Sequence, residues 1–123
     1  MASSVLVVDD DATFRHFARR ALTSWGHVVV GEASSAAEAI QRAGELRPDT
    51  VLADVGLPDG DGFTLTRDLL ALPSPPRVVL ISSDDDVANG SAATRVGAVG
   101  FVPKDELGGT LMKRLIAGER EPG

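Results

Sequence analysis

The 123-residue chain has no cysteine and no tyrosine, and it has only one tryptophan, four phenylalanines and two histidines. The absence of cysteine excludes disulfide bonds and thiolate ligands for a metal. The low aromatic content leaves few side chains that could stack on nucleic-acid bases. No apolar run approaches the length that crosses a membrane, and the N-terminus lacks the pattern of a signal peptide. We therefore expect a cytoplasmic protein that does not contact a membrane.

Positive charge is also scarce. The formal net charge is −6 and the pI is about 4.7. This balance argues against direct nucleic-acid binding, which depends on neutralising phosphates. The hydrophobic content of 43% and the charged content of 24% are ordinary for a soluble globular protein, and the length suits one domain. We predict a single domain over residues 4–117 and a C-terminal tail over residues 118–123.

Five short apolar runs alternate with five helix-like stretches along the chain. The runs are rich in β-branched residues and lack polar alternation, which favours strands covered on both faces. The strict alternation predicts an α/β domain with a parallel sheet between two layers of helices. The predicted strands are Val5–Val8, Val28–Val30 within His27–Ala33, Thr50–Asp54, Val78–Ile81 and Ala98–Val102. The predicted helices follow Asp11 as far as Trp25, follow Ser35 through Ala43, and cover about Thr64–Leu72, Asp84–Val96 and Asp105–Ala117.

Polar residues suited to a metal or a phosphate follow four of the five predicted strands. Ligands of a parallel α/β sheet gather beyond the carboxyl ends of its strands. The residues there are Asp9-Asp10-Asp11, Asp54, Ser82 and Lys104. A hard cation such as Mg²⁺, which prefers oxygen ligands, could neutralise the clustered carboxylates. Each residue also has an ordinary interpretation: the acids as helix caps, Ser82 as a strand-end hydroxyl and Lys104 as a surface lysine. The two histidines, His16 and His27, are expected to be solvated or locally bonded rather than metal ligands.

Four stretches in this order resemble the receiver domains of two-component response regulators. "VLVVDD" is similar to their first strand with its acidic pair, and "LADVGLPDGDG" to the phosphoacceptor strand and its loop. "VVLISS" and "GAVGFVPK" resemble the fourth and fifth strands with their hydroxyl and lysine. The resemblance extends from about Val5 to Ile116. It implies a flavodoxin-like (CheY-like) doubly wound fold, with a five-stranded parallel sheet in the order 2-1-3-4-5 and five helices.

The resemblance also implies a role for each matching residue. Asp54 is expected to accept a phosphoryl group, with Lys104 pairing first with its carboxylate and then with the phosphoryl group. Asp10 and Asp54 are expected to ligate Mg²⁺ through their side chains, Gly56 through its backbone carbonyl, and Asp9 through a metal-bound water. Ser82 is expected to donate to a phosphoryl oxygen.

The same resemblance implies a conformational switch. Ser82 would move toward the phosphoryl group, and Phe101 would fill the void that its loop leaves; the alternative for Phe101 is an ordinary packed aromatic. The readout surface would be the fourth helix, the fifth strand and the fifth helix. Asn89-Gly90 lies in this fourth helix, where glycine costs about 1 kcal/mol, so we expect this helix to be the most mobile. Gly56 and Asp84 occupy variable positions that tune the phosphoryl lifetime in the family, and its value here is left open.

Two other functions compete with an active receiver. A haloacid-dehalogenase type of phosphatase needs a second aspartate two residues after its nucleophile, where this chain has Gly56. A pseudo-receiver that only binds proteins remains the alternative. We expect no enzyme for external substrates, but a phosphoacceptor signalling domain that assists its own phosphorylation and dephosphorylation. The expected partners are a sensor histidine kinase or phosphotransfer protein and an unknown downstream target or output domain, and the expected state is a monomer or a phosphorylation-dependent homodimer.

Overall fold

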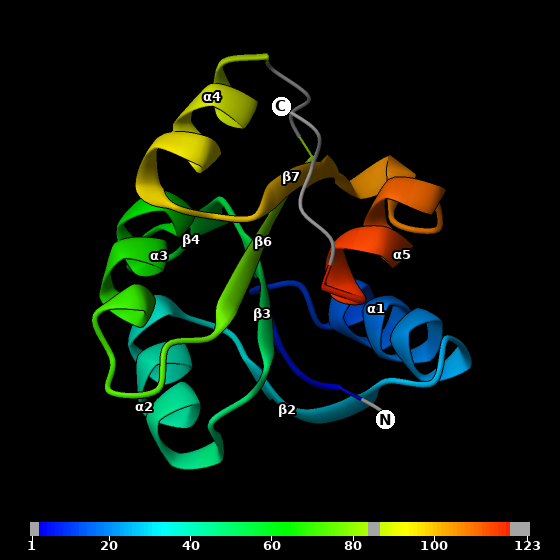
Figure 1. Ribbon diagram of the computed structural model, residues 1–123, viewed down its shortest axis with the longest axis horizontal. Helices are drawn as coiled ribbons and strands as arrows, with labels where there is room; N and C mark the ends of the chain where they lie inside the picture. Colours follow the sequence, from blue (N-terminus) through cyan, green and yellow to red (C-terminus); the bar gives the residue numbers. More distant parts are fainter. Residues whose placement is uncertain (1–2, 84–86, 119–123) are drawn as a thin grey trace.

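A computed structural model describes residues 3–83 and 87–118 of the chain (Figure 1). Asp84, which the sequence places at a variable position and at the start of the fourth helix, lies outside the described residues, and so does most of the expected tail. No helix of the described part combines the length and the apolar character that a membrane span requires.

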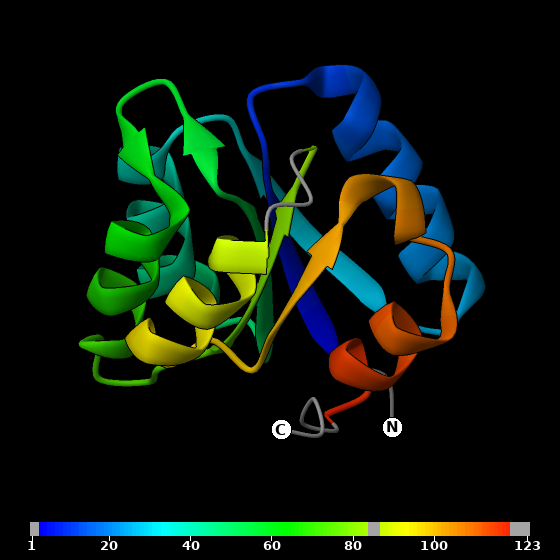
Figure 2. The same cartoon turned by 90° about the horizontal axis from the view of Figure 1, so that it is seen from above.

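Five parallel strands form one sheet at the centre of the molecule. Its order is β2-β1-β3-β6-β7, which confirms the expected order 2-1-3-4-5 because β4 and β5 form a separate hairpin. The strands of the sheet are β1 (Ser4–Val8), β2 (Val28–Ala33), β3 (Thr50–Asp54), β6 (Arg77–Ser82) and β7 (Gly100–Pro103). All neighbouring pairs run parallel, so their carboxyl ends meet at one edge of the sheet (Figure 2).

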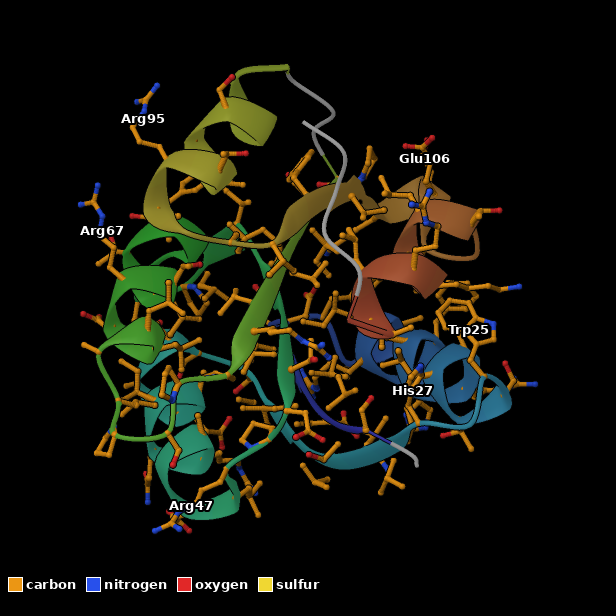
Figure 3. All side chains as sticks on the ribbon, in the orientation of Figure 1. Trp25, His27, Arg47, Arg67, Arg95 and Glu106 are labelled. Atoms are coloured by element: carbon orange, nitrogen blue, oxygen red, sulfur yellow. The ribbon has the colours of Figure 1, made fainter. Side chains whose placement is uncertain are left out.

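Helices cover both faces of this sheet. Figure 1 shows α2, α3 and α4 on one side, and α1 and α5 on the other. Trp25, at the end of α1, lies beside α5 (Figure 3), where the Lys113 ammonium is 5.4 Å from its ring centroid. The helices are α1 (Ala12–Ser24), α2 (Ala36–Leu46), α3 (Gly62–Leu70), α4 (Val87–Val96) and α5 (Thr110–Ile116).

Alternate residues of each inner strand pack into two separate apolar clusters. In β1, Leu6 and Val8 join the cluster beneath α2, α3 and α4, whereas Val5 and Val7 join the cluster beneath α1 and α5. This follows from the two-residue period of a strand. The inner strands are covered on both faces as predicted, but β2 lies at the edge and its Val28 is 53% exposed.

The structure corrects the predicted boundaries of the third and the last helix. The third helix begins at Gly62 rather than near Thr64, because Asp61 caps it by accepting from the Thr64 backbone amide at 2.8 Å. The last predicted helix is two elements, a 3₁₀ turn η1 (Lys104–Glu106) and α5. Gly108-Gly109 separates them, since glycine is a poor helix former.

The fifth strand is displaced toward Pro103 relative to the predicted Ala98–Val102. The short hairpin of β4 (Gly56–Leu57) and β5 (Gly60–Asp61) was not predicted. Two-residue strands are too short to show a hydrophobic period, so only the turn residues "GLPDGD" signal this hairpin.

Candidate functional site

The acidic run after β1 divides into three different environments. Asp9 is fully buried, and its Oδ1 accepts a hydrogen bond from the Asp11 backbone amide at 2.9 Å. Asp10 is exposed. Asp11 caps α1, as its alternative interpretation predicted, by accepting from the Thr13 amide at 3.0 Å. The backbone therefore turns directly after the buried carboxylate and leaves the next one open to solvent.

Asp54 ends β3, the central strand of the sheet, and is 8% exposed. Its Oδ1 accepts a hydrogen bond from the Gly56 backbone amide at 3.3 Å. Gly56 itself is exposed. The hairpin loop that follows is tied to α2, since the Asp59 carboxylate accepts hydrogen bonds from the amides of Ala36 and Ala37 at 2.8 and 3.0 Å. These contacts fix the position of the loop on one side of Asp54.

Lys104 joins two carboxylates that lie at the carboxyl ends of two different strands. Its Nζ is 2.7 Å from Oδ2 of Asp9 and 3.3 Å from Oδ2 of Asp54. The ammonium also lies over the ring of Phe14 on α1, 4.5 Å from its centroid. The side chain of Lys104 is 19% exposed, so it is not the solvated surface lysine of the alternative interpretation. Its three contacts place one positive charge between two buried negative charges.

Ser82 and Phe101 lie on the neighbouring strands β6 and β7. Both face the helix layer opposite to the one that Asp54 faces. Ser82 ends β6 and is 7% exposed, and Phe101 in β7 pairs with Leu80 of β6. Leu80 and Phe101 belong to the apolar cluster beneath α2, α3 and α4. By strand alternation Ser82 shares the face of Leu80, whereas Asp54 shares the face of Leu52, in the cluster beneath α1 and α5. Phe101 is thus a packed aromatic in this structure.

Burial and like charge dominate the electrostatics of the site. Burial raises the pKa of Asp54 above its ordinary value, and the Asp9 carboxylate raises it further, while Lys104 and the Gly56 amide act in the opposite direction. Burial alone would lower the pKa of Lys104, but its contacts with Asp9 and Asp54 outweigh burial and raise that pKa. Lys104 is therefore charged at neutral pH, and ionised Asp54 carries an unfavourable energy.

Three carboxylates of the site fit a hard divalent cation. One oxygen each of Asp9, Asp10 and Asp54 lies within 4.8 Å of the others. Oδ2 of Asp9 is buried, and the Lys104 ammonium lies 2.7 Å from it, whereas Asp10 is exposed to solvent. An all-oxygen set with one solvent-exposed member suits Mg²⁺, which keeps several waters. The histidines play no part: His16 is exposed, and Nδ1 of His27 is 2.7 Å from the Ser3 hydroxyl oxygen.

Asp54→Asn is expected to increase the stability of the metal-free protein at pH 7 by about 0.5 to 2 kcal/mol, as relief of an unfavourable functional group commonly does. The folded state raises the pKa of Asp54 above its value in the unfolded chain. The protonated carboxyl therefore stabilises the fold fully below the pKa of the unfolded chain, and this stabilisation is lost as the pH rises through the pKa of the folded state. The gain should therefore shrink toward zero in acid.

Urea unfolding of the wild type and of Asp54→Asn, from pH 7 down into acid, measures the difference in their free energies of unfolding. Asp68→Asn is the control, because Asp68 is exposed on α3 and its replacement makes the same change in net charge. A loss of stability in Asp54→Asn at pH 7, or an equal gain in Asp68→Asn, contradicts the expectation.

Several residues that shape the site were missed at the level of sequence. They are Phe14 beneath the Lys104 ammonium, Asp59 at the start of α2, and Gly62, whose buried backbone packs against Asp54. Phe14 is one of the apolar residues that recur at helical spacing after Asp11, and this periodicity indicated a helix but not this contact. The only signal for Gly62 is its place in the "DGDG" turn.

Comparisons with known proteins agree with this architecture. The family model described as "Response regulator receiver domain" matches residues 5–116. The chain is 30% identical over 104 residues to the chemotaxis protein CheY of Thermotoga maritima, covering 85% of this chain and 87% of CheY. It is 34% identical over 113 residues to the KDP operon transcriptional regulatory protein KdpE of Escherichia coli, covering 92% of this chain.

Solved structures give the same result. The signal receiver domain of NarL from Mycobacterium tuberculosis superposes with a TM-score of 0.85 at 34% identity, covering 96% of this chain and 98% of that domain. The chain spans 49% of KdpE and 58% of a further relative, a transcriptional regulator of Pseudomonas aeruginosa. The shared part of these proteins is therefore the α/β domain described above, and the chain belongs to the family of response regulator receiver domains.

Proposed function

We propose that this receiver domain is phosphorylated on Asp54 in the presence of Mg²⁺ and that the phosphoryl group changes its conformation. The observation that carries the proposal is the position of Lys104, whose ammonium contacts the carboxylates of both Asp9 and Asp54 at the carboxyl edge of the sheet. A structural ion pair needs only one carboxylate for each lysine. The second buried carboxylate destabilises the fold unless an incoming group interacts with it or with the Lys104 ammonium.

Each side chain of the site has a separate task in this reaction. The Asp54 carboxylate oxygen attacks phosphorus, the bond from phosphorus to the donor breaks, and the donor leaves with its electron pair. Lys104 neutralises charge on the phosphoryl oxygens, and the Ser82 hydroxyl donates to one of them. Asp9, Asp10, Asp54 and the Gly56 carbonyl would hold Mg²⁺, which supplies further positive charge to those oxygens when bound.

The switch is proposed to pass from Ser82 to Phe101. Ser82 ends β6 and Phe101 lies in the neighbouring strand β7, so a displacement of Ser82 would alter the surroundings of the aromatic ring. Phe101 packs in the same apolar cluster as Ala93 of α4. A phosphoryl group that favours one position of Ser82 would shift the population of conformations at the α4-β7-α5 surface.

The proposed setting follows from the family. The donor is a sensor histidine kinase or a phosphotransfer protein in the cytoplasm. The downstream partner is an output domain or a separate target protein, and phosphorylation acts on a monomer or drives formation of a homodimer. Relatives that are longer than this chain, KdpE among them, are named as transcriptional regulators, which makes a DNA-binding output domain one form that this target could take.

Incubation with acetyl phosphate and MgCl₂ followed by intact-protein mass spectrometry tests the proposal. We expect an adduct of one phosphoryl group on the wild type, none on Asp54→Asn, and an undiminished adduct on the control Asp68→Asn. Chelation of Mg²⁺ should suppress the reaction. A wild-type protein that binds Mg²⁺ but takes up no phosphoryl group would instead be a pseudo-receiver, and an equal adduct on Asp54→Asn would remove Asp54 as the acceptor.

A further inference from the structure

One arginine of α1 holds the backbone of the acidic loop. Arg15 Nη1 donates to the backbone carbonyl of Asp9 at 2.6 Å, and its Nε donates to Glu32 Oε1 at 3.0 Å. Glu32 lies in β2, one residue before its end, and its other oxygen accepts from Arg19 Nε at 3.0 Å. The guanidinium group of Arg15 thus connects the edge strand of the sheet to the residue that supplies the buried carboxylate.

The Asp9 carbonyl needs this donor. Asp9 follows the last residue of β1, and its backbone amide donates to the carbonyl of Ala33 at 3.0 Å. Its own carbonyl lies beyond the ladder of β1, where Arg15 donates to it. A backbone carbonyl that loses its donor in a largely buried position carries an energetic penalty and moves to find another. The Asp9 side chain would move with it.

Glu32 makes Arg15 a rigid donor and compensates its charge. The side chains of Arg15 and Glu32 are only 19% and 27% exposed. Burial alone would raise the pKa of Glu32, but the hydrogen bonds and charges of Arg19 and Arg15 hold it below its ordinary value, so Glu32 stays ionised at neutral pH. The planar guanidinium group fixes both ends of the bridge in one geometry, which a lysine cannot do.

We propose that Arg15 is a positioning residue for the divalent-cation site, acting through the backbone of Asp9. It touches none of the reacting groups, and it holds the loop that carries Asp9 and Asp10 in the geometry that the cation requires. Partners that orient the ligands of a metal typically change its affinity by about 10 to 100-fold. The inference rests on the proposed function only in taking Mg²⁺ as the resident cation.

Electrostatics and positioning predict opposite signs for the loss of Arg15. Removing a positive charge close to a cation site strengthens cation binding if charge alone matters. Removing a positioning residue weakens it. Arg19 is a matched control because it makes the same kind of ion pair with Glu32, at 2.9 Å from Nη2 to Oε2, and has no hydrogen bond to Asp9 among the described contacts.

The experiment is isothermal titration calorimetry with MgCl₂, which measures the Mg²⁺ affinity of the wild type, Arg15→Ala and Arg19→Ala. We expect the Mg²⁺ dissociation constant to rise about tenfold in Arg15→Ala and to change less than twofold in Arg19→Ala. Affinity in Arg15→Ala that is equal to or tighter than wild type overturns the proposal, and so does an equal loss in both variants. Urea unfolding confirms that each variant is folded. If Arg15→Ala does not fold, Arg15→Lys replaces it, because lysine keeps the charge but not the planar guanidinium group.

A readout without metal separates this inference from the proposed function. The Asp11 amide, which donates to the Asp9 carboxylate, should exchange with deuterium at least severalfold faster in metal-free Arg15→Ala than in Arg19→Ala. Unchanged exchange overturns the positioning role even if Mg²⁺ binds. A wild type that binds no Mg²⁺ or accepts no phosphoryl group would contradict the proposed function. Faster exchange in Arg15→Ala would still establish that Arg15 holds the backbone of Asp9.

Discussion

Lys104→Met is expected to lower the free energy of unfolding by about 2 to 3 kcal/mol at pH 7 without divalent cations. Lys104 is the ammonium that contacts both Asp9 and Asp54. Without it, the two buried carboxylates keep only their hydrogen bonds from the Asp11 and Gly56 amides to offset their mutual repulsion. That repulsion already contributes to the raised pKa of Asp54. Methionine keeps most of the length of the side chain, so the loss reports chiefly the missing charge, including its contact with the Phe14 ring.

Urea unfolding at increasing MgCl₂ concentration gives this prediction its specificity. A cation bound by the same carboxylates replaces the missing ammonium, so the deficit of Lys104→Met should narrow as MgCl₂ rises. Lys113→Met is the matched control, because Lys113 also lies over an aromatic ring but is exposed; it should lose less than about 1 kcal/mol. A deficit that widens with MgCl₂ would show that Lys104 and the cation do not share these ligands.

Gly62→Ala is expected to cost about 2 kcal/mol and to slow phosphorylation by acetyl phosphate about tenfold or more. A Cβ at Gly62 would lie 2.7 Å from the carbonyl oxygen of Asp54 and 2.9 Å from Cα of Val55. Both atoms belong to the backbone, so neither can give way as a flexible side chain would. The amide of Gly62 also donates to the Val55 carbonyl at 2.8 Å, which keeps the two segments in contact.

Gly60→Ala provides the control for this prediction. Gly60 lies two residues earlier, in β5, and has no positive φ. A Cβ at Gly60 would have open space around it, with no described neighbour within 4 Å. Its stability and its rate of phosphorylation should stay within about 0.5 kcal/mol and twofold of the wild type. Equal effects in the two variants would mean that the loop tolerates no side chain in general, rather than that Gly62 supports Asp54.

The five strands of the sheet could be predicted from the sequence because their signal is local. Apolar runs such as Val5–Val8 and Thr50–Asp54 show the pattern of buried strands without reference to distant residues. The helix caps Asp11 and Ser35 are similarly local, since each accepts from an amide two or three residues ahead. Where the local signal was mixed the prediction failed, as in the last helix, where Gly108-Gly109 outweighed the helical period.

The types of residue at the strand ends were also determined by the sequence. A parallel sheet brings those ends to one edge, so Asp9, Asp54 and Lys104 could be grouped before any distance was known. What each of them contacts was not determined, because Lys104 and Asp54 are separated by 50 positions along the chain. Contacts over such separations depend on strand register and on the direction of each side chain.

Only the tertiary structure decided how the charges of the site are balanced. It joined one ammonium to two buried carboxylates and left Asp10 exposed. It placed the Arg15 guanidinium group where it donates to the Asp9 carbonyl. It also brought the backbone of Gly62 against that of Asp54. Such pairings involve residues from different elements, and each depends on sub-ångström packing that local periodicity does not encode. The sequence by itself determined which groups gather at this edge, and packing decided which of them touch.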